Sequence, residues 1–104
     1  MNRYLGNAMQ FLTLSRRRTE QFSDTEFQSR LEAEAQRART LYSEGFIRQI
    51  WQRGDMPGAC LLLEADDEVQ VREGLESLPL VAAGMLEITH IVPLAPYRGF
   101  GPRS

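Results

Sequence analysis

The segment that most constrains the fold is GFIRQIWQRGDMPGACLLLEA, which runs from Gly45 to Ala65. Its two halves predict paired strands, Phe46–Arg53 and Ala59–Ala65, joined by a turn rich in glycine and proline. An antiparallel strand with one face in water alternates apolar and polar residues, but ACLLLEA does not alternate. We therefore expect the second strand to be covered on both faces of its sheet.

Two helical segments flank this hairpin. Apolar residues recur at steps of three and four from Asp24 or Thr25 up to Gly45, which predicts one long amphipathic helix that stops at the glycine. A second, shorter helix is predicted in DDEVQVREGLESLPL, with Asp66 or Asp67 as its N-cap and Pro79 as the residue that breaks it.

Strands are also predicted near both ends of the chain. Tyr4–Leu14 and Met85–Leu94 are rich in residues that favour strands. The intervening SRRR, Ser15 to Arg18, is predicted to be a solvated loop, although three arginines could also meet a phosphate or a carboxylate. Residues 95–104 contain too much glycine and proline to continue a strand, so we expect an irregular tail.

The order β-α-β-β-α-β predicts an α+β fold, the ferredoxin-like plait. In this fold a four-stranded antiparallel sheet carries both helices on one face. The length of 104 residues fits a single domain over residues 1–104. The other face of the sheet still needs cover, and a second copy packed sheet to sheet about a two-fold axis would supply it. We therefore expect a dimeric α+β barrel.

Charge and residue usage exclude several classes of function. The net charge of −2 gives no general attraction to nucleic acid. No apolar run approaches the length of a membrane span and no secretory signal is evident, so we expect a cytoplasmic protein without membrane contact. All 12 basic residues are arginine, which excludes lysine Schiff-base chemistry. One histidine, one cysteine and no clustered ligands predict no metal site.

The stretch EGFIRQIWQRGD, followed by ACLLLEADDEVQVREGLESLPLVAAGMLEI, resembles the muconolactone isomerase family of the dimeric α+β barrel superfamily. The shared features are Gly45 after the first helix, Arg-Gln-Ile-Trp at 48–51 where the family has Arg-His-Leu-Trp, and Leu-Pro-Leu at 78–80 before the last strand. The similarity runs without a gap from Glu44 to about Ile91, and is looser over the first helix and strand.

The resemblance implies a proton shift on a small unsaturated lactone or organic acid in aromatic catabolism. Family members work without a metal or redox cofactor and assemble as homodimers or larger homo-oligomers. Such a reaction removes a proton from carbon next to a carbonyl group and returns it elsewhere. It needs a base with a pKa near neutrality, a donor to the developing oxyanion and a dry pocket.

Two residues are candidates for the catalytic base. His90 is the only histidine, and histidine is the side-chain type whose ordinary pKa lies near neutrality. Glu34 stands at the position of the family's helix carboxylate. A histidine on an apolar strand face is more often structural, and most glutamates on such a helix are solvated, so both residues also have a non-catalytic interpretation.

Four residues of the first hairpin strand are candidates for substrate binding. Trp51 alternates with Gln49 and Arg53 on one face, whereas Arg48 lies on the other. If the Trp51 face lines the pocket, the polar side chains could hold a carboxylate or carbonyl group beside the indole. The alternative is that Trp51 belongs to a core or dimer interface and the arginines pair with acidic helices.

Departures from the family leave other functions open. Gln49 replaces the family's histidine, Ala35 follows Glu34 where the family has lysine, and Leu94-Ala95 replaces a C-terminal His-Pro. The thinning of polar groups favours a non-catalytic ligand-binding dimer, and a cofactor-free monooxygenase would use the same barrel. A nucleic-acid-binding plait would need exposed aromatic residues on its central strands, where only two candidates stand, namely Phe11 and Phe46.

Overall fold

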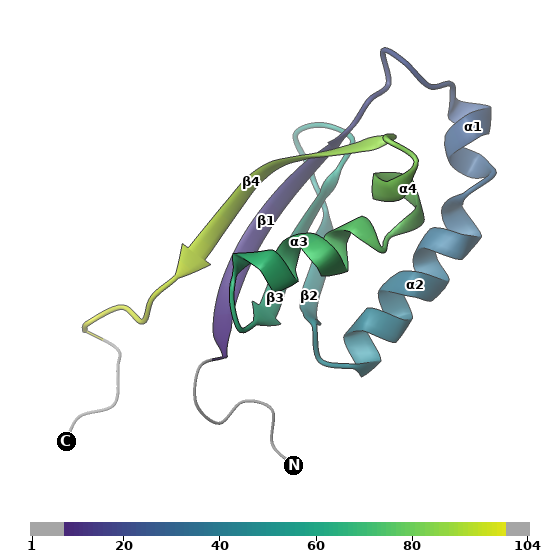
Figure 1. The fold of residues 1–104 in the computed structure, drawn as a ribbon. Coiled ribbons are helices and arrows are strands. Elements are labelled where there is room, and N and C mark those ends of the chain that lie inside the picture. Colours follow the sequence, from purple (N-terminus) through teal and green to yellow (C-terminus); the bar gives the residue numbers. More distant parts are fainter. Residues whose placement is uncertain (1–7, 100–104) are drawn as a thin grey trace.

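The computed structural model of the chain describes residues 8–99. Its strands form one antiparallel sheet in the order β2-β3-β1-β4, as expected for the predicted plait (Figure 1). The elements in chain order are β1 (Met9–Arg17), α1 (Asp24–Gln28), α2 (Leu31–Ser43), β2 (Ile47–Gln52), β3 (Ala59–Ala65), α3 (Glu68–Glu76), α4 (Pro79–Ala82) and β4 (Leu86–Leu94). The predicted four-stranded α+β sheet is confirmed.

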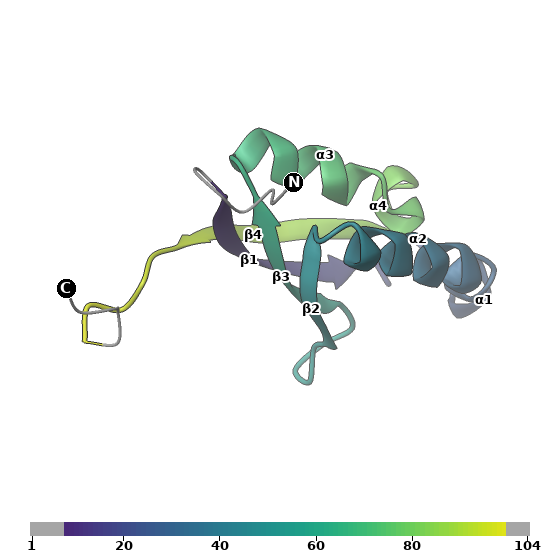
Figure 2. The same ribbon diagram turned by 90° about the horizontal axis from the view of Figure 1, so that it is seen from below.

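The helices gather on one face of the sheet and leave the opposite face without a covering layer (Figure 2). Alternate residues of the two central strands point toward the helices and are buried, as the strand period of two requires. The main core cluster contains Phe11, Leu41, Phe46, Ile47, Leu61, Leu63, Ala65, Val71, Leu75 and Leu78. We expected both faces of the sheet to be covered, but in a single copy the helices cover only one face.

The first strand extends further than its composition indicates. The prediction that Ser15–Arg18 is a loop was wrong for its first three residues, because Ser15, Arg16 and Arg17 pair with Ile88, Glu87 and Leu86 of β4. Backbone pairing along an inner strand continues through charged residues when their side chains reach partners or solvent. The start of the predicted strand, residues 4–7, lies outside the described residues.

The long helix is two helices, and the prediction of a single one was wrong. Ser23 is the N-cap of α1, and it forms a capping box with Glu26. The Ser29 hydroxyl donates to the carbonyl oxygen of Glu26 at 2.7 Å, in the turn that separates α1 from α2. Serine hydroxyls that bond nearby backbone groups compete with the helical ladder in this way. Gly45 ends α2 with a φ of 87°, as predicted.

The second helical region also divides. Asp67 caps α3, and its carboxylate accepts the backbone N–H of Gln70 at 2.9 Å. Pro79 follows the end of α3 and begins the short helix α4. Proline suits the first position of a helix because the N–H that it lacks would have no helical partner there. Residues 95–97, the described start of the tail, have no regular structure.

No helix within residues 8–99 combines the length and the apolar composition that a bilayer crossing requires.

Candidate functional site

The helix-free face of the sheet, called the open face below, carries rows of side chains that run across all four strands. Directly paired residues of antiparallel strands point to the same side. The central row consists of His90, Leu14, Cys60 and Trp51, one from each strand. The next row consists of Val92, Leu12, Leu62 and Gln49.

The open face is mostly apolar. Leu12, Leu14, Cys60 and Leu62 are half-buried at its centre. Toward its edges, Trp51 is 49 % exposed and Val92 is 42 % exposed in a single copy. A contiguous apolar patch of this kind on a small domain marks a site of interaction.

His90 brings an imidazole to the central row. Its Nδ1 lies 2.9 Å from the hydroxyl oxygen of Thr89, and that hydroxyl lies 3.1 Å from the carbonyl oxygen of Leu14, to which it donates. When the hydroxyl proton is directed at the carbonyl group of Leu14, the Thr89 oxygen can accept a hydrogen bond from Nδ1–H. In this tautomer Nε2 carries a lone pair, and within residues 8–99 it has no hydrogen-bond partner. Nε2 can therefore accept a proton from a ligand on the open face.

Trp51 and Gln49 share the open face with His90 but lie at the opposite edge of the sheet. Three strand spacings separate β4 from β2, which places the backbones of His90 and Trp51 about 14 Å apart. This exceeds the length of a small lactone acid. Within one copy, the candidate base and the candidate binding residues therefore do not meet around one small substrate.

Glu34 lies on the other side of the sheet. Its Oε1 accepts the backbone N–H of Leu80 at 2.9 Å, so this carboxyl group of α2 caps the first turn of α4. Burial raises the pKa of Glu34, while the bond from Leu80 and the nearby charge of Arg17 partly oppose that rise. The structure does not bring Glu34 and His90 together.

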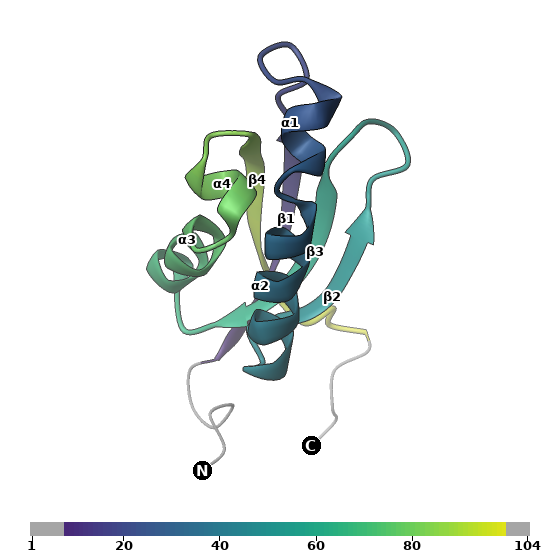
Figure 3. The same ribbon diagram turned by 90° about the vertical axis from the view of Figure 1, so that its right-hand side faces the viewer.

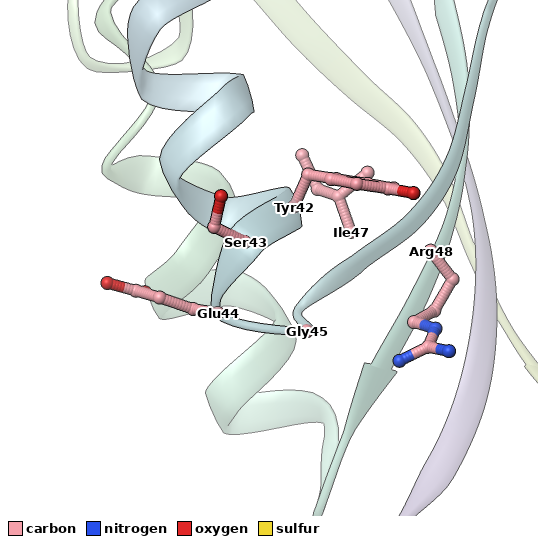
Figure 4. Close-up of a pocket in the computed structure, with 6 residues that line it drawn as sticks. All are labelled: Tyr42, Ser43, Glu44, Gly45, Ile47 and Arg48. Carbon is pink, nitrogen blue, oxygen red and sulfur yellow. The ribbon is translucent and has the colours of Figure 1, made fainter.

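Arg48 lies at the irregularity in β2, where the register with β3 shifts between Ile47 and Gln49. It lines a hollow of about 310 Å³ at the junction of α2 and β2, where its side chain extends on the opposite side of Gly45 from Glu44 (Figure 4). The other lining residues are Tyr42, Ser43, Gly45 and Ile47. Arg48 is thus separate from the central row.

Arg53 is held by its own hairpin. Its Nε and Nη2 donate to the carboxylate of Asp55 at 3.0 and 2.7 Å, and its Nη1 donates to the carbonyl oxygen of Ser15 at 3.3 Å. The hydrogen bond from Arg53 holds the pKa of Asp55 below its usual value. Arg53 therefore fastens the β2–β3 turn to β1.

Several residues near these positions were not predicted from the sequence to belong to the site. Thr89 sets the tautomer of His90 through a cross-strand bond to Leu14, and that bond depends on a register shift between Leu14 and Ser15. The sequence identifies Leu14 and Cys60 only as apolar residues of strands. The alternation of Leu12 and Leu14 could have placed both on one face, but it could not have identified which face.

Residues 8–99 contain no cluster of three or more histidine, cysteine, aspartate or glutamate side chains arranged to hold a metal ion. In the two rows described above, the groups that can hydrogen-bond to a ligand are the imidazole of His90, the amide of Gln49, the indole N–H of Trp51 and the thiol of Cys60.

Comparison with known proteins identifies the family of the chain. A search of curated proteins gave no match. The family model for muconolactone delta-isomerase matches residues 9–99, which is most of the chain and includes every strand and helix described above. The chain therefore belongs to the muconolactone delta-isomerase family.

Proposed function

We propose that the protein isomerises a small unsaturated lactone or organic acid by a cofactor-free proton shift, with His90 as the base. One observation carries the proposal: the only imidazole of the chain stands on the apolar open face with Nε2 available as an acceptor. Nε2 takes the proton from carbon next to the carbonyl group, and the electron pair of that bond spreads into an enolate. The imidazolium then returns the proton to the far carbon of the conjugated system.

The enolate oxygen needs hydrogen-bond donors in a site without bulk water. We assign this role to the amide of Gln49 and the indole N–H of Trp51, whose ring also supplies an apolar wall. These two residues share the open face with His90, which supports the assignment, but the whole width of the sheet separates them from it. A second copy of the chain resolves this separation.

We propose a homodimer, or a larger homo-oligomer built from it, in which two open faces pack together. A two-fold axis that runs along the strands places β2 of one copy opposite β4 of the other. Trp51 and Gln49 of one copy then face His90 of its partner across the roughly 10 Å between packed sheets. Each dimer contains two such composite sites and excludes water from both.

Proton exchange tests the reaction directly. The protein is mixed with muconolactone in D₂O, and NMR follows both deuterium uptake at carbon and the movement of the double bond. His90→Ala should lower the rate at least a hundredfold, in line with the usual contribution of a general base. Thr40→Ala, an exposed change on α2, should leave the rate unchanged. A His90→Ala protein with full activity would exclude His90 as the base.

The same samples separate the alternative functions. Oxygen consumption with a phenolic substrate and no proton shift would assign the protein to the cofactor-free monooxygenases. Ligand binding without turnover in any assay would identify a binding protein.

Mixing two inactive variants tests the composite site. His90→Ala and Trp51→Ala proteins are unfolded together and refolded, so that mixed dimers form. Statistical mixing should restore about a quarter of the wild-type activity, because half of the dimers are mixed and each mixed dimer has one intact site. If both residues serve one site within a single copy, the mixture should stay inactive.

A further inference from the structure

A second candidate site lies at the end of the sheet where the β2–β3 hairpin folds against the end of β1. Here Arg17, Gln52, Arg53, Pro57 and Gly58 line a hollow of about 220 Å³. The hairpin and α1 lie at this same end of the sheet (Figure 3). The site involves the helix-covered side, because Arg17 pairs with the buried Leu86 and its guanidinium lies over the Phe27 ring of α1, 5.1 Å from the ring centre.

The backbone around the hollow is fixed. The Arg17 N–H donates to the carbonyl oxygen of Pro57, and the Arg53 N–H donates to that of Gly58, both at 3.0 Å. Gly58 has a φ of 155°, and a Cβ atom there would lie 2.1 Å from the carbonyl oxygen of Ser15. Only glycine lets the hairpin approach β1 this closely. The close approach places Arg17 of β1 and Arg53 of the β2–β3 hairpin around one hollow.

The two guanidinium groups have donors to spare. The Arg53 side chain is only 12 % exposed and uses three of its five N–H groups on Asp55 and Ser15. The guanidinium of Arg17 makes no hydrogen bond to any residue of the described range 8–99. The carboxyl group of Glu34, whose pKa the charge of Arg17 lowers, accepts its hydrogen bond from Leu80 instead. Two cations thus line one hollow, and only Arg53 has a carboxylate hydrogen-bonded to it.

We propose that this hollow binds the carboxylate group of a small organic acid, held between Arg17 and Arg53. Arginine presents paired N–H groups that match the two oxygens of a carboxylate. Asp55 neutralises one of the two cations, so the remaining positive charge suits a singly charged carboxylate better than a doubly charged sulfate or phosphate. The small volume restricts the acid to a few carbon atoms beyond the carboxylate. The hollow shares no lining residue with the two rows of the open face, and the proposal does not depend on the proposed isomerisation.

Titration with butanoate, followed by NMR of the ¹⁵N-labelled protein, tests this site. Butanoate should shift the backbone signals of Arg17, Gln52, Arg53 and Gly58. The uncharged isostere butanamide should leave them in place, and sulfate should bind more weakly than butanoate. Equal shifts with butanamide, or tighter binding of sulfate, would overturn the proposal.

Two variants with opposite expected effects sharpen the test. Arg17→Gln, which breaks no hydrogen bond within residues 8–99, should weaken butanoate binding at least tenfold. The matched control Arg72→Gln alters an arginine on α3 that pairs with Glu68, and it should leave binding unchanged. Asp55→Asn should tighten binding severalfold, because it removes the competing carboxylate from Arg53. Unchanged affinity in either Arg17→Gln or Asp55→Asn would contradict the assigned arrangement.

Discussion

At the scale of single residues, Glu34 shows how a candidate catalytic carboxyl group serves the fold. Its Oε1 accepts the Leu80 N–H beneath α4, and burial raises the pKa of the group above the ordinary value of 4.5. A raised pKa means that the folded state binds the proton more tightly than the unfolded state does. The resulting stabilisation is full below pH 4.5 and is lost as the pH rises through the higher pKa of the folded state.

Glu34→Gln should therefore stabilise the protein at pH 7. Glutamine keeps an acceptor for the Leu80 N–H but does not ionise, so the gain in the free energy of unfolding should shrink as the pH falls toward 4.5. Urea denaturation between pH 4 and pH 7 measures both effects. Glu34→Ala is the control, since it leaves the N–H without an acceptor and should cost about 1–3 kcal/mol throughout. A less stable Glu34→Gln protein at pH 7 would show that attraction to Arg17 outweighs burial.

His90 and Arg17 illustrate the opposite case, in which a polar side chain retains unused hydrogen-bonding capacity. Within residues 8–99, Nε2 of His90 and the guanidinium of Arg17 have no hydrogen-bond partner. Buried polar groups of a finished fold are normally satisfied, so partly exposed groups with spare capacity are where ligands bind. We therefore expect two different ligands, one on each side of the sheet.

At the scale of elements, the contact between α3 and Phe46, the residue before β2, depends on Gly74. A Cβ atom at Gly74 would lie 2.3 Å from Cζ of the Phe46 ring, well inside van der Waals contact. Gly74 is therefore required by packing, although glycine lowers the helix propensity of α3.

Gly74→Ala should lower the free energy of unfolding. Overpacking against Phe46 costs about 1–3 kcal/mol, and the better helix propensity of alanine recovers about 1 kcal/mol of this. Urea denaturation at pH 7 measures the difference. Gly54→Ala is the matched control, because no atom lies within 4 Å of the new methyl group, and it should stay within about 0.5 kcal/mol of the wild type.

A second comparison isolates the steric cause. In a Phe46→Leu background the aromatic ring is absent, so Gly74→Ala should no longer destabilise. If the loss persists without the ring, steric overlap with Phe46 is not its source.

At the scale of the whole molecule, the proposed assembly depends on the open face. A single layer of sheet with helices on one side leaves a half-buried apolar centre of Leu12, Leu14 and Leu62, and water contact with these side chains is unfavourable. Self-association would remove that contact and complete the proposed active site.

Sedimentation analysis should therefore give at least twice the chain mass of 11.9 kDa for the wild type at micromolar concentration. Leu62→Glu places a charge at the centre of the open face and should yield a folded monomer with lost or sharply reduced isomerase activity. Val69→Glu, on the exposed surface of α3, is the matched control and should remain associated. A wild-type protein that sediments as a monomer would exclude the composite site.

The amino-acid sequence by itself determined the order of the four strands and the helical character of the two regions between them, but not the division of each region into two helices. Its apolar period changes between two and three to four residues from one region to the next, and these periods follow from strand and helix geometry alone. Ala59–Ala65 was predicted to the residue, and Gly45 was correctly predicted to end α2. Family membership likewise rests on local motifs, such as Leu-Pro-Leu at 78–80, that are visible in the chain.

Only the tertiary structure decided which of these residues meet. Glu34 and His90 lie on opposite sides of one sheet, Ser15–Arg17 extend β1, and Arg17 shares a hollow with Arg53. Each of these facts depends on strand register, on a bulge or on the path of a hairpin. The energies that set register come from contacts between segments far apart in sequence, so no local pattern contains them.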